Sequence, residues 1–381
     1  MPNNLLITNC LVSGNSKPCD IIIERGIITQ LGKGLKVPSG YDRFDAGSSI
    51  VSPGFIDVHV QGAGGADILD SREEALHTIS QTCARYGVTG FLATTVYKPG
   101  RENLHLRVAA RNTGTDLGGA QLLGIHLEGP FISSKKRGMI QPDSISPPSM
   151  SELERILELT GGTLRIMTIA PELKGIERLI ARLREQGIVA SFGHSNATYE
   201  QTLAGFEAGI SHVTHLFNAM PTMHHREPGA LPALFECNIS AQVIPDGVHI
   251  HPAVLRLACQ LLGPERTVAI TDGMQAMGLP DGEYEYNGLR YRSVDGTARY
   301  GDGTLIGTAL GMSELLRRLQ DFSHFTFDQT LRTATINPAR VIGIRGHGAS
   351  IEQGTSGNLV ILDKFFSVHA TIVSGKVVYQ R

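Results

Sequence analysis

Residues 164–193 read LRIMTIAPELKGIERLIARLREQGIVASFG, with an apolar run at each end and a helical pattern between them. The runs 164–170 and 188–193 are short and apolar, which is typical of buried parallel strands. The segment between them repeats apolar residues at helical spacing and stops at Gly187, as a helix with one buried face does. That face would consist of Ile176, Leu179, Ile180 and Leu183. A strand, a helix and a second strand in this order form the repeating unit of a parallel sheet.

The same alternation recurs along most of the chain. Helical patterns follow two further strands, at Ala75, Leu76, Ile79 and Cys83, and at Leu255, Ala258, Leu261 and Leu262. Eight strand–helix units predict an α/β fold, a (β/α)8 TIM barrel. The candidate strands are 55–60, 90–95, 122–127, 164–170, 188–193, 211–216, 239–244 and 267–272.

Both ends of the chain lack helical periodicity. Residues 1–53 and 346–381 hold short strand-like segments separated by Gly, Asn, Ser and Pro, so we expect them to form one small β-sandwich domain together. The barrel would then span residues 54–345. Within it, the Gly-rich stretch 278–305 carries Asn287-Gly288, a dipeptide typical of hairpin turns, and we expect a hairpin that forms a lid or rim.

Composition limits the classes of partner. A chain of 381 residues is long enough for one large domain and a small one, and its formal net charge of -2 provides no basic surface for a nucleic-acid backbone. No stretch approaches the roughly 18 apolar residues of a membrane span, and the N-terminus lacks a secretory pattern. Five cysteines without a CxxC pair predict reduced thiols rather than a disulfide framework. These features predict a soluble cytoplasmic protein with a small-molecule partner and no membrane contact.

Three candidate metal ligands directly follow apolar runs. Glu128 ends the strand in GIHLEGPF, His194 follows the one in SFGHSNAT, and His215 lies at the end of VTHL. Strand ends of a parallel barrel meet at one mouth, and imidazole and carboxylate are the ligands of catalytic zinc sites that keep one position open. One histidine alone would be weak evidence, but the three together predict a single divalent ion. Zinc is the expected metal, and iron, cobalt or manganese accept the same donors.

Asp272, in AITDGM, ends the last candidate strand and is our candidate general base and acid. Water activated by a metal ion needs a group to accept its proton and return it to the departing nitrogen. The alternative is that Asp272 caps a helix that begins in TDGM.

The first strand ends in Asp57-Val58-His59-Val60-Gln61, where His59 and Gln61 face the same side. A histidine at position 61 would complete an HxH metal pair, whereas glutamine is a poor zinc ligand, so a second ion would bind weakly at most. His59 then has three open interpretations: a contact to water or substrate, a ligand of a loosely bound second ion, or a hydrogen-bonded core imidazole.

Two loops after barrel strands are candidates for binding a substrate anion. The run 224–229, HHREPG, contains Arg226, which could hold a phosphate through paired hydrogen bonds, and the run 246–249 reads DGVH. The alternative for the first loop is a solvated charged surface. The chain contains no phosphate-binding or dinucleotide glycine motif in a strand–helix context, so neither ATP nor NAD is implied.

In order along nearly the whole chain, PGFIDVHVQG, GIHLEGPFIS, GHSNAT, THLFNAM, HREPG, DGVH, TDGM and GTLIGT resemble the N-acetylglucosamine-6-phosphate deacetylases of the amidohydrolase superfamily. The resemblance implies metal-dependent hydrolysis of an acetamide, giving glucosamine 6-phosphate and acetate. It also implies that Glu128, His194 and His215 hold the metal and that Asp272 transfers the proton.

The resemblance further implies a set of substrate contacts and a homodimer in which Arg226 reaches the phosphate across the interface. The implied contacts are Asn218, Ala219, Arg226, Asp246, Gly247, Val248, His249, Leu305, Ile306 and Gly307. The family carries a Lys-Gly-x-His stretch that contacts the sugar phosphate. Here the corresponding stretch reads Lys136-Arg137-Gly138-Met139-Ile140, with Ile140 in place of the histidine, and the resemblance implies that Met139 and Ile140 contact the substrate.

Three alternatives remain open from the sequence. The segments HHREPG and MQAMGLPDG also resemble the branch that acts on N-acetylgalactosamine 6-phosphate. A second alternative is an N-acyl amidohydrolase acting on an amino acid or a cyclic amide. A third is a sugar-phosphate sensor that has lost its chemistry.

Overall fold

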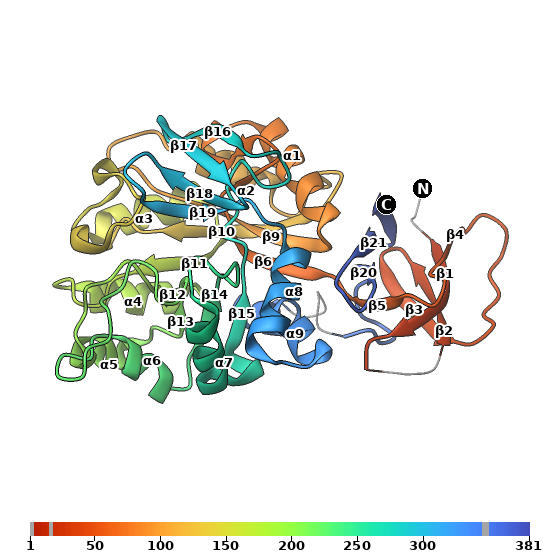
Figure 1. Ribbon diagram of the computed structural model, residues 1–381. Coiled ribbons are helices and arrows are strands. Elements are labelled where there is room, and N and C mark those ends of the chain that lie inside the picture. The colour runs from red at the N-terminus through yellow and green to blue at the C-terminus, as the bar shows by residue number, and fades with distance from the viewer. Residues whose placement is uncertain (1–3, 15–17, 345–349) are drawn as a thin grey trace.

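The computed structural model describes residues 4–14, 18–344 and 350–381, and it consists of a parallel barrel beside a mostly antiparallel sheet domain (Figure 1). The eight predicted barrel strands are confirmed and pair in the order β15-β14-β13-β12-β11-β10-β9-β6. An isolated bridge joins Val60 of β6 to Gly273, which follows β15, and a second joins Gly273 to Thr308. The barrel strands are β6 (Phe55–Val60), β9 (Val88–Thr95), β10 (Gln121–Glu128), β11 (Leu164–Ile169), β12 (Val189–Phe192), β13 (His212–Val213), β14 (Ser240–Val243) and β15 (Thr267–Ala269).

Several strands end earlier than the sequence predicts. Strand β13 covers only 212–213 of the expected 211–216, and β15 covers 267–269 of the expected 267–272. The residues that follow have left-handed backbone angles, with φ of 27° at His215 and 48° at Asp272. A positive φ takes the chain out of the extended conformation that a ladder requires, so these residues belong to turns at the barrel mouth.

Helices cover the outside of the barrel, and the apolar residues predicted for the helix 176–187 are all buried on its inner face. The buried face predicted for the helix after the seventh strand is partly wrong. Leu255, Ala258 and Leu262 are buried, but Leu261 is 45% exposed. The helices are α1 (Glu73–Arg85), α2 (Leu104–Asn112), α3 (Met150–Thr160), α4 (Ile176–Glu185), α5 (Tyr199–Ala208), α6 (Leu231–Glu236), α7 (Pro252–Arg266), α8 (Met312–Ser323), α9 (Phe327–Thr333) and α10 (Ile336–Val341). Short 3-10 turns are η1 (Ile68–Asp70), η2 (Ser134–Lys136) and η3 (Pro142–Ser144).

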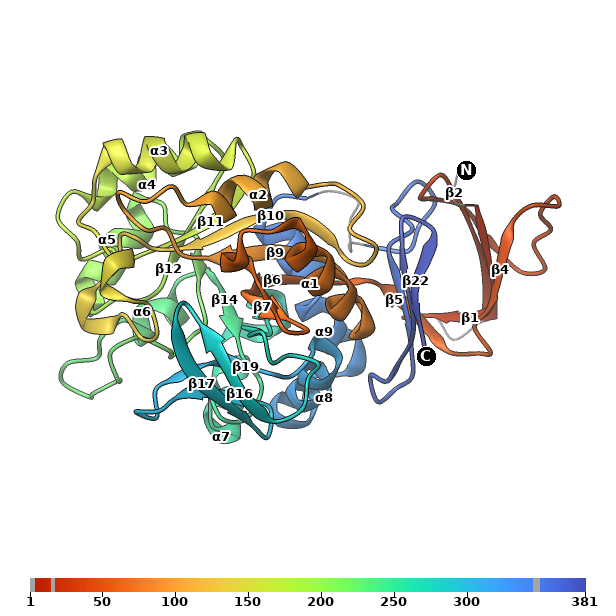
Figure 2. The same cartoon turned by 90° about the horizontal axis from the view of Figure 1, so that it is seen from above.

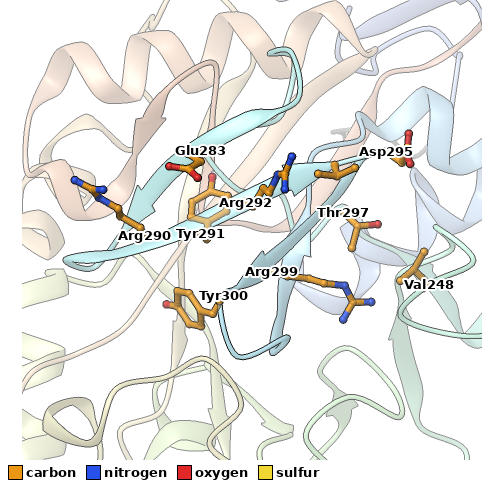
Figure 3. Close-up of a pocket in the computed structure, with 11 residues that line it drawn as sticks. Val248, Glu283, Arg290, Tyr291, Arg292, Asp295, Thr297, Arg299 and Tyr300 are labelled. Carbon is orange, nitrogen blue, oxygen red and sulfur yellow. The ribbon is translucent and has the colours of Figure 1, made fainter.

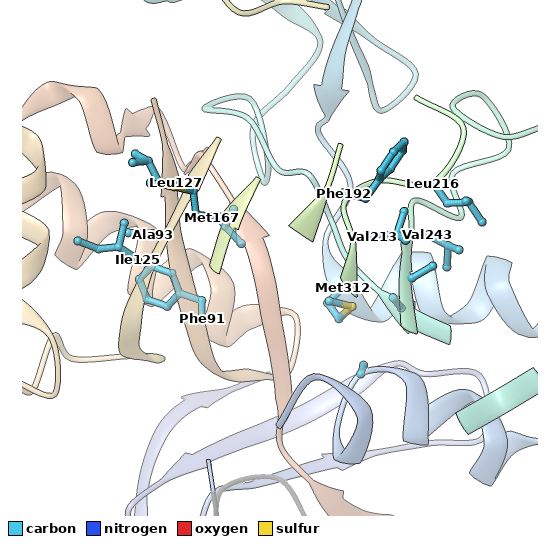
Figure 4. Packing of buried hydrophobic residues seen from close by; sticks show 14 of the residues in the cluster. Phe91, Ala93, Ile125, Leu127, Met167, Phe192, Val213, Leu216, Val243 and Met312 are labelled. Carbon is cyan, nitrogen blue, oxygen red and sulfur yellow. The ribbon is translucent and has the colours of Figure 1, made fainter. Parts of the chain in front are cut away.

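Alternate residues of β10 face two different environments. Ile125 and Leu127 pack in the apolar layer between strands and helices, part of which is seen in Figure 4. His126 and Glu128 face the other way, because successive side chains of a strand point to opposite faces. Nδ1 of His126 lies 2.9 Å from the carbonyl oxygen of Val58, and its Nε2 lies 2.9 Å from Oγ1 of Thr168. The barrel interior is therefore polar directly below the mouth.

The segments at the two ends of the chain share one eight-stranded sheet, as predicted, with the order β22-β21-β20-β5-β1-β2-β3 and β4 paired to β1. Figure 2 shows β22 and β5 lying across from β1 and β4. The strands are β1 (Leu5–Val12), β2 (Pro18–Glu24), β3 (Ile27–Gly32), β4 (Asp42–Asp45), β5 (Ile50–Pro53), β20 (Leu359–Leu362), β21 (Val368–Val373) and β22 (Lys376–Gln380). The expected domain boundary at 345/346 lies outside the described residues, and the domain limits stay a prediction.

The Gly-rich insertion forms a four-stranded antiparallel sheet over the barrel mouth rather than a single hairpin. Its first turn is the predicted one, since Asn287 and Gly288 both have positive φ between paired strands. The strands are β16 (Gly282–Tyr286), β17 (Leu289–Val294), β18 (Thr297–Tyr300) and β19 (Leu305–Thr308), and the small hairpin β7 (Gly62–Ala63) and β8 (Ala66–Asp67) follows β6. Among the described residues, no helix is both long and apolar enough to cross a membrane.

Candidate metal centre and active site

The three predicted ligands converge at the barrel mouth. Oε1 of Glu128 lies 3.2 Å from Nε2 of His194 and 3.2 Å from Nε2 of His215, and the two Nε2 atoms are 3.0 Å apart. All three side chains are buried, and their ligand atoms lie within 4.8 Å of one another. Within the described ranges, this is the one group of three or more His, Cys, Asp or Glu side chains that could hold a metal ion.

The hydrogen bonds of His194 show which of its nitrogens is available as a ligand. Its Nδ1 lies 3.0 Å from the carbonyl oxygen of Lys136, which can only accept, so Nδ1 carries the hydrogen. In the neutral ring Nε2 then presents a lone pair toward Glu128 and His215. A backbone carbonyl that fixes the tautomer of a histidine in this way is a common feature of metal sites.

The donor set fits a divalent cation. Two buried imidazole nitrogens and a carboxylate oxygen crowd together, and nearby the Oε1 atom of Gln61 and the Nε2 atom of His59 are buried without a hydrogen-bond partner. Burial would raise the pKa of Glu128, but the charge of His59 and the close polar contacts with His194 and His215 outweigh it and hold that pKa well below its usual value. Glu128 is therefore an anion in the folded protein, as a metal ligand must be.

Asp272 lies beside this group. Its Oδ1 accepts a hydrogen bond from Nε2 of Gln61 at 3.2 Å and lies 3.2 Å from Nε2 of His59. In the described chain no helix begins directly after Asp272, so its interpretation as a helix cap is wrong. The left-handed backbone at Asp272 is accompanied by a close approach of β19: a side chain added at Gly307 would meet the carbonyl oxygen of Asp272 at 2.5 Å. Glycine at position 307 is what allows the two segments to lie so close.

His59 is completely buried, and Gln242 contacts the ring nitrogen that faces away from the two carboxylates. Its Nδ1 lies 3.0 Å from Oε1 of Gln242, and the same oxygen accepts from the backbone N–H of His215 at 3.3 Å. Burial would lower the pKa of His59, but the carboxylates Glu128 and Asp272 outweigh it and raise the pKa to about 9. With Nδ1 donating to Gln242, Nε2 faces the two carboxylates.

Gln242 is a site residue that the sequence analysis missed. It lies inside the apolar run ISAQVI, where it is the one amide among buried aliphatic side chains, and its exposure is 0%. A polar residue at such a position needs a partner, so the sequence signals that Gln242 has a buried partner but does not show which residue it is. Asp57 was also missed: its Oδ2 accepts from Oγ1 of Thr271 at 2.5 Å and so ties β6 to the segment that carries Asp272.

A pocket of about 190 Å³ opens above the metal ligands. Of the expected substrate contacts, six line it: Met139, Asn218, Ala219, His249, Leu305 and Ile306. Gly138 lines it as well, and Gly307 adjoins it on β19.

Asp246 is buried and fixes the loop that carries His249, a residue of the pocket wall. Its Oδ2 lies 2.7 Å from Nδ1 of His249, and its Oδ1 accepts from the backbone N–H groups of Val248 and His249. Gly247 lies in the same turn, with φ of 81°.

Three expected contacts lie elsewhere. Ile140 is 1% exposed and packs with Val96 and Ile132 beside the pocket. Val248 is 46% exposed and faces a larger cavity of about 780 Å³ under the β16–β18 sheet (Figure 3). Arg226 is exposed and does not line the pocket, and its guanidinium lies 2.7 Å from Nε2 of His225.

A TIM barrel with a Glu–His–His group and a further carboxylate at its mouth is the architecture of a metal-dependent hydrolase. The family model described as "Amidohydrolase family" matches residues 50–378. The chain belongs to this family.

Relatives across nearly the full length are sugar-phosphate deacetylases. The N-acetylglucosamine-6-phosphate deacetylase of Bacillus subtilis (strain 168) is 36% identical over 336 residues, which is 87% of this chain and 85% of that protein. The N-acetylgalactosamine-6-phosphate deacetylase of Escherichia coli O157:H7 is 34% identical over 87% of this chain and 88% of that protein. A mutant of the N-acetyl-D-glucosamine-6-phosphate deacetylase of Mycobacterium smegmatis, solved in complex with N-acetyl-D-glucosamine-6-phosphate, superposes with a TM-score of 0.89 at 33% identity, covering 100% of both chains.

Proposed function

We propose that this enzyme hydrolyses the acetamide of N-acetylglucosamine 6-phosphate to glucosamine 6-phosphate and acetate. The observation that carries the proposal is the convergence of Glu128, His194, His215 and Asp272 at one barrel mouth. The end-to-end similarity to N-acetylglucosamine-6-phosphate deacetylases supports the choice of substrate.

One divalent ion, held by Glu128, His194 and His215, completes the site. When bound, such an ion polarises an amide carbonyl and lowers the pKa of water. Zinc fits this donor set best, and iron, cobalt or manganese would also be accepted. A second ion would bind weakly, because position 61 offers a neutral amide that already donates hydrogen bonds to Glu128 and Asp272.

Asp272 moves the proton in this proposal. As a carboxylate at the pocket wall, it accepts a proton from the attacking water and returns it to the amine nitrogen as the C–N bond breaks. We assign His59, whose Nε2 lies 3.2 Å from Oδ1 of Asp272, to stabilising the negative charge that develops on the acetyl carbonyl oxygen. Gln242 keeps His59 in that orientation by accepting from its Nδ1.

Met139, Ala219, Leu305 and Ile306 form the apolar wall of the pocket, and Asn218 and His249 add polar groups. We propose that the apolar wall contacts the acetyl group and the sugar ring, and that Asn218 and His249 form hydrogen bonds with sugar hydroxyl groups. Asp246 holds His249 in place for this contact.

The phosphate requires a cation that the pocket lacks in this chain alone, since no Lys or Arg is among the described residues lining it. We assign this role to Arg226 of the partner subunit in a homodimer. Arg226 is exposed and makes no ion pair with a described carboxylate within 4.0 Å. An exposed apolar face of α7, consisting of Val254, Leu257 and Leu261, is the kind of surface a second copy would cover.

A second candidate substrate is the galactosamine epimer, favoured by the 34% identity to the E. coli N-acetylgalactosamine-6-phosphate deacetylase. We place the reaction in the cytoplasm, because all five cysteines are free thiols, the state that a reducing compartment maintains.

Initial rates on N-acetylglucosamine 6-phosphate, N-acetylgalactosamine 6-phosphate and unphosphorylated N-acetylglucosamine test the substrate. The proposal predicts release of the amine from the phosphorylated sugars only, fastest with the glucosamine form. A faster rate with the galactosamine form would reassign the epimer. Equal rates with and without phosphate would contradict the role given to Arg226 and favour an N-acyl amidohydrolase of broader specificity.

A further inference from the structure

Cys10 on β1 and Cys19 on β2 face each other across two neighbouring antiparallel strands of the sheet domain. Their Sγ atoms are 3.8 Å apart, and the thiol of Cys10 donates a hydrogen bond to the carbonyl oxygen of Cys19 at 2.9 Å. Cys10 is completely buried in the apolar core of this domain, whereas Cys19 is partly exposed. The proposed hydrolysis uses neither residue.

A bulge in β1 creates this pair. At Ile7 the partner on β2 is Ile21, and the same register continued along the strand would place Pro18 opposite Cys10. The register shifts by one residue between Ile7 and Cys10, so Cys19 stands opposite Cys10 instead.

The bulge is anchored by Asn9, whose φ is 53°. The backbone N–H of Asn9 donates to Oδ1 of Asp20 at 3.2 Å, and its side-chain amide donates to Oδ1 of Asp45 at 3.0 Å. These contacts come from the next strand on either side, so the fold itself fixes the register that pairs the two thiols.

The pair meets the geometric requirement for a disulfide. Residues directly opposite on antiparallel strands have Cα atoms about 4.5–5.5 Å apart, and disulfides span Cα separations of roughly 4.4–6.8 Å. Closing the gap between the sulfur atoms therefore needs side-chain rotation and little backbone movement. We propose that Cys10 and Cys19 form a reversible disulfide when the protein meets a peroxide.

The difference in exposure sets the order of events. Peroxide reaches the partly exposed Cys19 first and converts its thiol to a sulfenic acid, and one water molecule is released. The thiol of Cys10 then attacks the Cys19 sulfur, the S–S bond forms, and the sulfenic oxygen leaves as a second water. Two thiols and one peroxide thus give one disulfide and two waters. Burial and the neighbouring Cys19 raise the pKa of Cys10, so Cys10 is the resolving thiol and not the one that meets the oxidant.

The decisive experiment is peptide mass analysis of the whole protein after hydrogen peroxide treatment. Free thiols are blocked with iodoacetamide in denaturant, and the chain is then cut with trypsin without reduction. Because trypsin does not cleave the Lys17–Pro18 bond, both cysteines remain in one peptide, residues 1–25. After peroxide we expect this peptide to carry no iodoacetamide label and to be lighter than the unlabelled reduced peptide by two hydrogen atoms. Treatment with dithiothreitol should restore two thiols that iodoacetamide labels.

Two variants serve as controls. Cys10→Ser should stop the reaction at Cys19 sulfenic acid, which dimedone traps, and Cys237→Ser, which changes another partly exposed thiol, should form the disulfide as the wild type does. The proposal is overturned if peptide 1–25 of the wild type still takes two blocking groups after peroxide. It is equally overturned if Cys19 proceeds to sulfinic acid while Cys10 stays blockable. The wild-type masses decide the question even if Cys10→Ser does not fold.

Discussion

Nε2 of His194 and Nε2 of His215 lie 3.0 Å apart, both directed at the carboxylate of Glu128. The two rings meet nearly edge to face, with an interplanar angle of 78°. Nitrogen lone pairs this close repel each other unless a proton or a cation lies between them. This relationship is the strongest structural argument for a bound metal ion.

Replacing His194 with Ala should lower bound metal and turnover by roughly tenfold or more, because one of three protein ligands is lost. His212→Gln is a matched control: His212 is also fully buried, but its Nδ1 lies 2.7 Å from Oγ of Ser240 and it is outside the metal group. Elemental analysis of metal per chain, alongside kcat, checks both variants. Wild-type metal content in His194→Ala would remove it from the ligand set.

Replacing Gln242 with Leu should lower kcat by roughly 10- to 100-fold while the protein stays folded, because the acceptor for His59 Nδ1 and His215 N–H is lost. Gln242→Glu keeps an acceptor oxygen, so its kcat should fall less than that of Gln242→Leu. The measurement is kcat and KM for both variants at equal metal loading. A Gln242→Leu enzyme with unchanged kcat would show that Gln242 merely fills space.

Asp67 should contribute to the free energy of unfolding at low pH, and this contribution should be lost as the pH rises through about 7. Burial raises the pKa of Asp67 from 3.8 to about 7, so between these values the folded protein binds a proton that the unfolded chain has lost. This stabilisation is complete below pH 3.8 and is lost as pH rises through 7. Asp67→Asn keeps an acceptor for the N–H of Leu69 and stays neutral, so its melting temperature should fall less than the wild type's between pH 5 and pH 8. Parallel curves would exclude this role of Asp67.

Arg226→Ala should raise KM roughly 10- to 100-fold for phosphorylated substrates, the loss expected for a charge-assisted contact. Whether Arg226 acts across an interface can be tested by co-expressing Arg226→Ala and Asp272→Asn chains with different affinity tags. A mixed dimer contains one site with an intact Asp272 and an intact Arg226 of the partner subunit, so at a substrate concentration near the wild-type KM purified mixed dimers should be more active than either parent dimer. Mixed dimers no more active than the Arg226→Ala dimer would place Arg226 in its own subunit's site.

The barrel and the metal group were predictable because their signals are local. Glu128 ends a buried strand and His194, His215 and Asp272 each come shortly after one, and strand ends in a parallel barrel meet at one place. The sequence also placed Met139 and Ile140 together as contacts, yet in the structure only Met139 lines the pocket, because Ile140 turns into an apolar cluster with Val96 and Ile132.

Other features depend on distant residues and were not predictable. Gln242 looks like an isolated polar residue in a strand, and its role emerges only when β14 stands beside His59 of β6 and His215. Leu261 fits the helical pattern of α7 but lies 45% exposed, because the pattern alone does not reveal how wide the buried face is. The pairing of Cys10 with Cys19 depends on a bulge whose anchors lie on β2 and β4.

The most direct test of the account is acetate release from N-acetylglucosamine 6-phosphate by metal-loaded wild-type enzyme and by Asp272→Asn, with metal content measured in both. We predict that the wild type releases acetate and glucosamine 6-phosphate in equal amounts. The variant should bind as much metal but turn over about 100- to 10,000-fold more slowly, since only the proton-transferring carboxylate is lost. No acetate from the wild type, or an Asp272→Asn enzyme of near wild-type rate, would contradict the account.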